Sequence, residues 1–326
     1  MTFAQTYGSA SGAELPGARV IAVGGGKGGV GKTFFVANVA AAIAKQGAQV
    51  VVVDGDLEGA NLHTCLGVRP PRHGLADYVA QREVDLPKLL VDTCVPGLRL
   101  IAGTHGNLSD AQPTHEERLR LLARLRELPV HLVLIDLGAG THDSVMDYFL
   151  ASDDGIVVLN PEPTSIENAY SFLRAAFYRR MRLAMVSHAV RALVTEAMDQ
   201  CNERGIRTPL DLLREVQARD PSEGGRFSEA VRRFRPRLVV NEVGTAQDIK
   251  LGFGVRSVCR KYFGIDAEYL GYVNHDPAVR ESVMARSPVV YAHPNSNAAI
   301  YLDRIARKLA SETLSSGAVA LDLRRT

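Results

Sequence analysis

Short, uninterrupted apolar runs alternate with amphipathic segments along most of the chain. The runs predict strands, or strands followed by loops, at 19–25, 48–56, 97–103, 131–140, 154–164, 235–243 and 267–273. Runs that are apolar at every position are typical of parallel strands covered on both faces. Helical spacing predicts helices over 32–47, with Gly47 as the C-cap, and over 114–129. The alternation predicts an α/β fold, a doubly wound and mostly parallel sheet flanked by helices, with ligands at the carboxyl ends of the strands.

Residues 173–236 interrupt this rhythm, because they contain no strand pattern. They predict three or four helices, broken at 204–209 and 220–225. From Arg174 to Arg237 the chain has 14 arginines against 8 acidic residues. We interpret the segment as a helical insertion, longer than an ordinary crossover, whose arginines form a solvated helical face rather than a binding patch.

The remaining boundaries follow from composition. Residues 1–17 are rich in small residues and predict a disordered tail. Residues 18–313 then form a single domain that contains the insertion, and 314–326 form a C-terminal tail. At 46% apolar residues the chain has enough material for a large core, and its formal net charge of +2 gives no sign of nucleic-acid binding.

The compartment is predicted from what the chain lacks. The first residues have neither the basic region nor the apolar region of a signal peptide, and no 18-residue window is uniformly apolar. The four cysteines are scattered and none forms a C-x-x-C pair, which suits a reducing compartment. We therefore expect a cytoplasmic protein.

A glycine-rich stretch, GGGKGGVGKT at 24–33, carries the main chemical signal. From Gly26 to Thr33 it matches G-x-x-x-x-G-K-[ST] between a predicted strand and a predicted helix, which is the context that a phosphate-binding loop requires. Lys32 is expected to contact the β- and γ-phosphates of ATP, and the Thr33 hydroxyl to ligate Mg²⁺. The expected nucleotide-binding residues of the loop are Gly26, Lys27, Gly28, Gly29, Val30, Gly31, Lys32, Thr33 and Phe34.

Three aspartates end predicted strands and supply the acidic side chains that such a site needs. Asp136 follows an apolar run and is expected to hold the metal, while Asp54 and Asp56 end another run as VVVDGD. One carboxylate of this last pair can help organise Mg²⁺, a role that we assign to Asp54, and the other can orient water. The alternative is a pair of turn-forming aspartates.

Lys27 is not needed in a loop that already has Lys32. A lysine at the tip of the loop can reach the phosphates of another molecule if two loops face each other. The string KGGVGKT resembles the deviant phosphate-binding loop of the MinD/ParA family of P-loop ATPases, in which the first lysine is the signature residue. This resemblance implies an ATP-sandwich homodimer in which Lys27 acts on the partner's nucleotide, with Lys27, Lys32 and Asp56 as catalytic residues.

The resemblance covers most of 19–172 and 236–310. Segments such as NPEPTSIENAY (160–170) and EYLGYVNHDPAVRESVMARSPVV (268–290) are similar to the flagellar-number regulators of the FlhG/FleN type. Asn241 matches the asparagine that contacts adenine in the family. The resemblance implies a slow ATPase, stimulated by dimerisation or by a protein partner, that regulates the position or number of flagella, or a cell pole or division site.

Two departures from the family pattern bear on these expectations. Asn274 stands where the family often has a proline, which leaves the details of the base pocket open, and the 173–236 insertion has no counterpart in short members. Iron–sulfur carriers of this superfamily need cysteines that meet across the dimer axis, and its tyrosine kinases need a tyrosine-rich tail. The chain has neither feature. A ParA-like segregation ATPase that binds nonspecific DNA through basic residues is the main alternative.

Membrane contact is a secondary expectation. MinD and the flagellar regulators end in a short basic amphipathic helix that binds lipid. Here residues 297–314 align Ile300, Ile305, Leu309 and Leu314 on a predicted helix, a stripe that more often packs against a sheet. The last residues, AVALDLRRT, are few, and Asp322 opposes insertion. A peripheral position at the inner face of the membrane therefore ranks below a purely cytoplasmic one.

Overall fold

One large sheet organises the molecule. The computed structural model describes residues 17–322 except 57–58, 80–84, 104–112 and 200–201, with side chains described as far as Thr313. Within these residues eight strands form a single sheet in the order β3-β4-β2-β5-β1-β6-β7-β8. The strands are β1 (Arg19–Gly24), β2 (Val50–Asp54), β3 (Val91–Asp92), β4 (Leu98–Ile101), β5 (Leu132–Asp136), β6 (Asp154–Leu159), β7 (Arg237–Val243) and β8 (Glu268–Asn274). All neighbouring pairs are parallel except β3 with β4.

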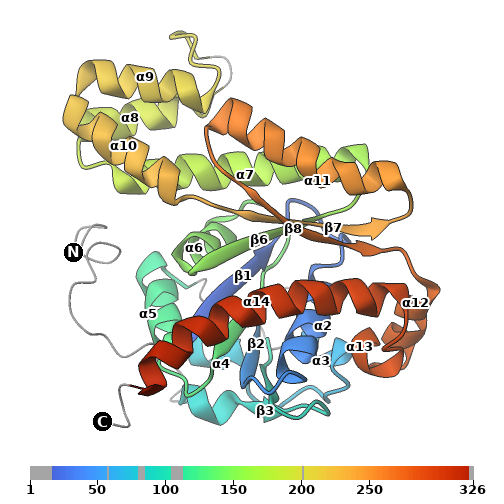
Figure 1. Ribbon diagram of the computed structural model, residues 1–326. Coiled ribbons are helices and arrows are strands. Elements are labelled where there is room, and N and C mark those ends of the chain that lie inside the picture. Colours follow the sequence, from blue (N-terminus) through green and yellow to red (C-terminus); the bar gives the residue numbers. More distant parts are fainter. Residues whose placement is uncertain (1–16, 57–58, 80–84, 104–112, 200–201, 323–326) are drawn as a thin grey trace.

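Helices cover both faces of the sheet (Figure 1). They are α2 (Lys32–Ala44), α3 (Leu62–Cys65), α4 (Leu75–Val79), η1 (Leu86–Leu89), α5 (His115–Arg126), α6 (Asp143–Ala151), α7 (Pro163–Ala184), α8 (His188–Glu196), α9 (Pro209–Arg219), α10 (Pro221–Arg233), α11 (Ala246–Val258), η2 (Cys259–Phe263), α12 (Pro277–Met284), α13 (Val289–Ala292) and α14 (Asn297–Asp322). The prediction of a doubly wound, mostly parallel sheet is therefore confirmed.

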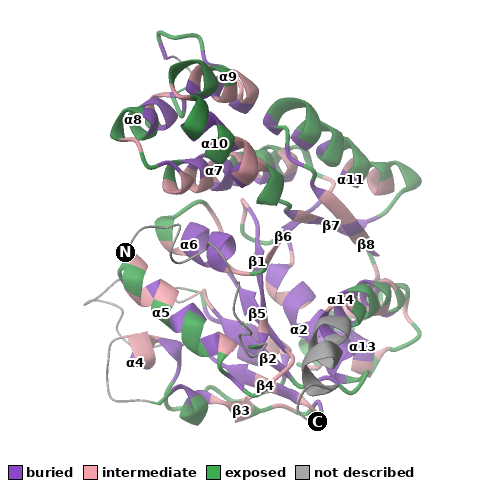
Figure 2. Ribbon diagram, turned by 60° about the vertical axis from the view of Figure 1, so that its left-hand side comes forward, coloured by how far each residue is buried: buried purple, intermediate pink, exposed green. Residues whose placement is uncertain are grey.

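Burial explains why the strands are apolar at every position. Along β1, Val20 and Ala22 belong to the core on the side of α5, α6 and α7, whereas Ile21 and Val23 belong to the core on the side of α2 and α14. Figure 2 shows the strands as the buried centre, with exposed residues on the outer helices. A strand buried on both faces has no position for a polar residue until it ends, so the polar residues collect at the strand ends.

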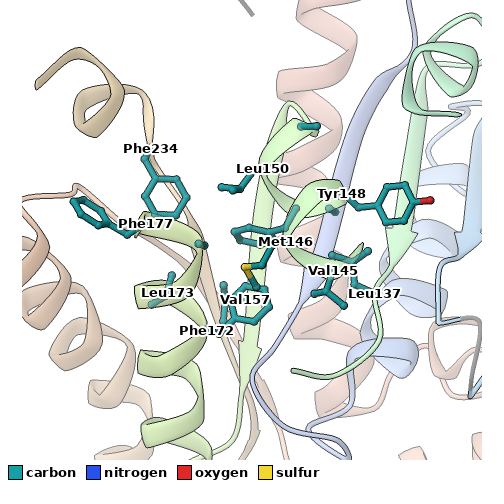
Figure 3. Packing of buried hydrophobic residues seen from close by; sticks show 14 of the residues in the cluster. Leu137, Val145, Met146, Tyr148, Leu150, Val157, Phe172, Leu173, Phe177 and Phe234 are labelled. Atoms are coloured by element: carbon teal, nitrogen blue, oxygen red, sulfur yellow. The ribbon is translucent and has the colours of Figure 1, made fainter. Parts of the chain in front are cut away.

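The helical insertion is built on α7, with α8, α9 and α10 beyond it on the side away from the sheet (Figure 1). Phe177 of α7 and Phe227 of α10 join them, with ring centroids 6.1 Å apart, and Phe177 lies in the same cluster as Phe172 and Phe234 (Figure 3). Four helices, α7 to α10, are present where three or four were predicted. The predicted start at 173 is wrong, because α7 is one continuous helix from Pro163, and residue 173 lies in its interior.

The break predicted at 220–225 is present, and it lies at Asp220, between the end of α9 at Arg219 and the start of α10 at Pro221. Asp220 caps α10 by accepting hydrogen bonds from the N–H groups of Ser222 and Glu223, so the helix begins at Pro221. A Cβ atom on Gly224 would lie 2.5 Å from Cγ of Gln217. The glycine therefore allows α9 and α10 to pack closely and does not end a helix.

Charged residues at the amino ends of the strands anchor α14. Nε of Arg19 donates to Asp154 at 2.9 Å, and Nη2 of Arg237 lies 2.7 Å from Glu312 of α14. Arg237 also contacts Glu268 at 3.1 Å. The side chains belong to β1, β6, β7 and β8, so one ionic row joins four strands to the C-terminal helix.

The C-terminal helix differs in part from expectation. Ile305 and Leu309 are buried as predicted, but Ile300 is 39% exposed. The helix continues to Asp322, so the predicted tail does not begin at residue 314. The side chain of Leu314, residues 323–326 and residues 1–16 of the predicted disordered tail lie outside the described residues. In the described part of the chain, no helix combines the length and apolarity needed to cross a membrane.

Candidate nucleotide site

The glycine-rich loop joins β1 to α2 in a backbone shape that only glycine accepts easily. Gly29 and Gly31 have φ angles of 80° and 87°, a region that disfavours residues with a Cβ atom. A Cβ on Gly31 would lie 2.3 Å from Nδ2 of Asn241. Gly31 is also the N-cap of α2, and it makes no side-chain hydrogen bond to the first turn. The N–H groups of this turn therefore point to a site suited to anions.

The two lysines of the loop point to different places. Lys32 is 8% exposed, and its Nζ donates to the backbone carbonyl of Lys27 at 3.3 Å, across the loop. Nζ of Lys27 instead lies 3.2 Å from Oε2 of Glu162 and 3.3 Å from Oγ1 of Thr164, at the start of α7. The side chain of Lys27 is 41% exposed. Lys32 thus closes the phosphate cradle, while Lys27 lies outside it.

Two of the predicted carboxylates meet beside the loop. Asp54 and Asp136 are paired across β2 and β5, and Val23 of β1 is the other partner of Asp136. Both aspartates are almost completely buried. Burial raises the pKa of Asp136 to about 7 and that of Asp54 to about 6, although the N–H groups of Leu62 and Asp56 donate to Asp54 and oppose the shift.

The positive charge of Lys32 compensates the charge of these carboxylates only in part. Burial lowers the pKa of Lys32, and the charges of Asp136 and Asp56 oppose that shift. The raised carboxyl pKa values and the lowered lysine pKa have the same cause, which is loss of water around charged groups. The site is therefore short of positive charge beside its buried acids.

Asp56 has a different environment from Asp54. It is only half-buried, and its Oδ1 accepts a hydrogen bond from the N–H of Gly59 at 3.0 Å. A Cβ on Gly138, in the loop after β5, would lie 3.3 Å from the same oxygen. The carboxylate therefore lies between two loops at the carboxyl edge of the sheet, with access to solvent.

The residues present fit ATP with Mg²⁺. Oδ1 of Asp136 is buried without a hydrogen-bond partner, while the Thr33 hydroxyl hydrogen-bonds the carboxylate. Carboxylate and hydroxyl oxygens are the ligands that Mg²⁺ prefers, with phosphate and water completing its shell. A Cβ on Gly28 or Gly29 would meet nothing within 4 Å, so no described residue covers the tip of the loop.

Asn241 and its neighbours close the other side of the loop. Asn241 is buried, and its Nδ2 donates to the carbonyl of Val30 at 3.0 Å. The next residue, Glu242, has a positive φ of 57° and accepts a hydrogen bond from Nδ2 of Asn160 at 2.9 Å. Oδ1 of Asn160 is buried without a partner. Asn241 therefore supports the loop itself, and contact with a base remains a prediction.

Sequence reasoning missed Asn160, Glu162 and Glu242 as parts of this site. A usable signal was present, because Asn160 follows the apolar run of β6 and Glu242 comes next to the last residue of β7. Polar residues at the carboxyl ends of adjacent parallel strands collect at one edge of the sheet. The positive φ of Glu242 could not be predicted from the sequence, because glutamate rarely adopts this backbone conformation.

The arginines of the insertion are mostly engaged inside it. Arg204 pairs with Glu196, Arg219 with Glu215, and Arg232 and Arg233 with Glu229. Others donate to carbonyl groups or to buried acids, as Arg179 does to Asp147 and Arg191 does to the Met185 carbonyl. The arginine excess is therefore largely engaged in ion pairs and hydrogen bonds within the molecule, many of them inside a single helix.

Comparison with known proteins agrees with this geometry. The CobQ/CobB/MinD/ParA nucleotide binding domain family matches residues 21–289. The antiactivator FleN of Pseudomonas aeruginosa is 26% identical over 296 residues, covering 90% of this chain and 86% of FleN. The flagellum site-determining protein YlxH of Helicobacter pylori is 28% identical over 183 residues, covering 53% of this chain and 58% of YlxH.

The fold is also that of a solved structure. The septum site-determining protein MinD of Pyrococcus horikoshii, complexed with Mg-ADP, superimposes with a TM-score of 0.61 at 21% identity. The superposition covers 90% of this chain and 96% of that one. The predicted fold and the predicted family resemblance are both confirmed.

Proposed function

The chain belongs to the CobQ/CobB/MinD/ParA family of nucleotide-binding domains, and on that premise we propose that it is an ATPase that works as a nucleotide-sandwich dimer. It binds ATP with Mg²⁺, pairs with a second copy, and hydrolyses ATP slowly until dimerisation or a protein partner stimulates it. The observation that carries the proposal is the divergence of the two loop lysines. Lys32 closes the cradle at 3.3 Å from the Lys27 carbonyl, while the Lys27 side chain lies outside it beside Glu162.

Each residue of the site has a role in this proposal. Lys32 and the N–H groups of the loop bind the phosphates, and Thr33, Asp54 and Asp136 hold the metal. These three residues would hold Mg²⁺, whose charge would neutralise part of the phosphate charge. Asp56 orients the attacking water, since its carboxylate is near the cradle and reaches solvent.

Two further residues complete the proposal. Lys27 leaves Glu162 and reaches the nucleotide bound by the partner subunit, where it stabilises the charge that develops on the transferred phosphoryl group. Asn241, at the closed end of the loop, contacts the base. Because one side chain comes from each copy, neither copy alone has a complete catalytic site.

The cellular role that we propose is control of the position or number of a structure. The relatives that support it are an antiactivator, FleN, and a flagellum site-determining protein, YlxH. Such a role needs a protein that exists in two states and changes between them slowly. ATP-dependent pairing followed by slow hydrolysis supplies the two states. We place the protein in the cytoplasm, with peripheral contact at the inner face of the membrane as a further option.

Binding to nonspecific DNA is the second candidate function, as in a ParA-like segregation ATPase. The 14 arginines of 174–237 are the observation in its favour, and their pairing with Glu196, Glu215 and Glu229 weakens it. Electrophoretic mobility shifts with ATP at two salt concentrations separate the candidates. A shift that salt abolishes favours the DNA reading, and its absence favours the regulator.

Size-exclusion chromatography with light scattering tests the proposal. The nucleotide-free and ADP-bound protein should have the mass of one chain, and the protein with ATP and Mg²⁺ should have the mass of two. A mass of one chain under all three conditions, with ATP shown to be bound, would contradict the sandwich. If the protein with ATP is a dimer, affinity capture with the ATP-bound Asp56→Ala variant identifies the protein partner.

A further inference from the structure

A cavity lies at the junction of the insertion with the ATPase sheet, away from the nucleotide loop. Its volume is about 220 Å³, which is room for roughly seven water molecules at ~30 Å³ each. One wall comes from the end of α6 and the start of β6, and the other from α7 and the end of α10. Leu150 and Phe234 lie on these two sides (Figure 3).

The cavity and the nucleotide loop are at opposite ends of the same strand. Asp154, the first residue of β6, lines the cavity, while Asn160 follows the last residue at the nucleotide edge. At about 3.3 Å per residue the two ends are separated by roughly 17–20 Å. The cavity is therefore a separate site that the ATPase chemistry does not use.

Three arginines line the cavity: Arg180, Arg233 and Arg235. The guanidinium of Arg180 lies over the ring of Phe234, 5.7 Å from its centroid, and its Nε donates to the Ala230 carbonyl. Nε of Arg233 contacts Glu229 at 2.6 Å, and Nε of Arg235 donates to the Arg232 carbonyl at 3.3 Å. The bonds of Arg233 and Arg235 engage Nε, and each guanidinium carries four further N–H donors.

The two acidic residues of the cavity are already neutralised from outside it. Asp153 accepts hydrogen bonds from the N–H of Val20 at 2.7 Å and from Nη2 of Arg126 at 2.9 Å. Asp154 accepts from Nε of Arg19 at 2.9 Å. Each aspartate has an arginine partner elsewhere, and Arg233 is in turn paired with Glu229. The residues that line the cavity therefore carry an excess of arginine over unpaired carboxylate.

We propose that this cavity binds a small organic anion with two or more negative charges, a phosphate ester or a polycarboxylate. The paired N–H donors of an arginine guanidinium match the oxygens of a phosphate or a carboxylate group. The volume is below that of a site for a drug-sized ligand, and the walls formed by Phe234, Phe149 and Leu150 leave room for an apolar part of the molecule. A ligand there touches the insertion and the sheet at once, so it holds α10 against the start of β6.

Calorimetric titration with pyrophosphate and with citrate tests this site, at constant ionic strength. The titrations use the Lys32→Ala background, so that the phosphate-binding loop does not contribute. We expect saturable binding of at least one probe. If only pyrophosphate binds, the site is one for a phosphate ester, and if only citrate binds, it is one for a polycarboxylate. Arg233→Ala with Arg235→Ala should weaken it about tenfold or more, since two charged hydrogen-bonding groups are lost.

The control removes two other arginines of the insertion. Arg214 and Arg219 lie on α9 outside the cavity, in pairs with Asp211 and Glu215. Changing both to alanine alters the net charge equally and should leave the affinity unchanged. Absence of saturable binding for both probes, equal loss in both double variants, or full affinity after loss of Arg233 and Arg235 would each overturn the proposal. Circular dichroism confirms that each variant is folded.

Discussion

At the scale of single residues, the site holds negative charge that its own lysine does not balance. Asp54 and Asp136 are paired across two strands and are almost completely buried, and the pKa of Asp136 is raised to about 7. A buried carboxylate without a counter-charge is destabilising. Two buried carboxylates at this place support the proposed binding of a metal ion together with the nucleotide.

Lys32 is the residue on which nucleotide binding depends most directly. We expect Lys32→Ala to lose ATP affinity by about 100-fold or more, because the buried ammonium is the main charged partner of the β- and γ-phosphates. Isothermal titration calorimetry measures the loss. Lys250→Ala, on the exposed face of α11, is the matched control and should keep wild-type affinity. Equal affinity in the two variants would contradict the assignment.

The raised carboxyl pKa values predict that metal-nucleotide affinity depends on pH. Mg²⁺ needs ionised carboxylates, so affinity should be constant above about pH 8 and fall as the pH drops through 7 and then 6, where Asp136 and Asp54 take up protons. One proton costs about tenfold in affinity per pH unit below the pKa. The same protons stabilise the nucleotide-free fold, whose stability falls as the pH rises through 7.

Calorimetry in buffers of different ionisation enthalpy checks this, because binding near pH 6.5 should release protons. Asp136→Asn binds more weakly, and its proton release should fall below that of the wild type. ATP itself also titrates near this pH, but it contributes equally in both experiments. Subtracting the proton release of the variant from that of the wild type therefore removes the contribution of ATP. Identical proton release in both would show that Asp136 is already ionised.

Asp56 is expected to act on hydrolysis and not on binding, because its carboxylate lies outside the buried pair and reaches solvent. Asp56→Ala should bind ATP and form the dimer, with a turnover reduced about 100-fold. A phosphate-release assay on the variant, beside calorimetry on the same sample, separates the two effects. Turnover at the wild-type rate would remove Asp56 from the mechanism.

Most residues of the candidate site could be predicted from the sequence, because each stands at the end of an apolar run. The loop residues, Asp54 and Asp136 follow buried strands, and a polar residue at that place has few structural reasons to exist. Asn160 also follows an apolar run and could have been assigned in this way, but Glu162 could not. Its place in the site depends on the contact with Lys27, 135 positions away, and such a distant contact leaves no local pattern.

At the scale of elements, α7 joins the phosphate-binding loop to the insertion. Its first residues contact Lys27, its middle packs on Gly26 and Gly24, and its far end holds α8 and α10. Because α7 is continuous from Pro163 to Ala184, one helix contacts both the loop and the insertion. The element also shows why the predicted boundary at 173 failed, since the core helix and the insertion share the same periodicity.

A matched pair of glycine substitutions tests the contact between the loop and α7. A Cβ on Gly26 would lie 1.9 Å from the Asn168 carbonyl of α7, whereas a Cβ on Gly28 would meet nothing within 4 Å. We expect Gly26→Ala to destabilise the nucleotide-free protein by about 1–3 kcal/mol and Gly28→Ala to have little effect. Thermal unfolding measures both, and equal melting temperatures would contradict the close packing.

The remaining differences at this scale also have local causes. The break predicted at 220–225 is narrower than six residues, because Asp220 alone separates α9 from α10 and Gly224 lies within α10, where it allows close packing with α9. Ile300 reads as part of an apolar stripe and is 39% exposed, because the buried face of α14 follows Leu302, Ile305 and Leu309. Single residues of ambiguous chemistry decide such boundaries, and only the tertiary contacts settle them.

At the scale of the whole molecule, the central claim is that one chain is half of a catalytic unit. Lys27 lies outside the cradle that Lys32 closes, and in the described part of the chain its side chain makes exposed contacts with Glu162 and Thr164. An exposed ion pair contributes about 0–1 kcal/mol, so the lysine is readily released to a second nucleotide. We therefore predict that only the dimer hydrolyses ATP, and that turnover per chain rises with protein concentration in dilute solution.

The most direct test is Lys27→Ala, studied by sedimentation velocity and calorimetry on the same sample, with ATP and Mg²⁺. The account predicts that this variant binds ATP with nearly wild-type affinity but sediments as a monomer and does not hydrolyse ATP, while the wild type sediments as a dimer. If Lys27→Ala instead loses ATP affinity as Lys32→Ala does, or if the wild type is a monomer with a turnover independent of concentration, Lys27 acts in its own subunit and the sandwich account is wrong.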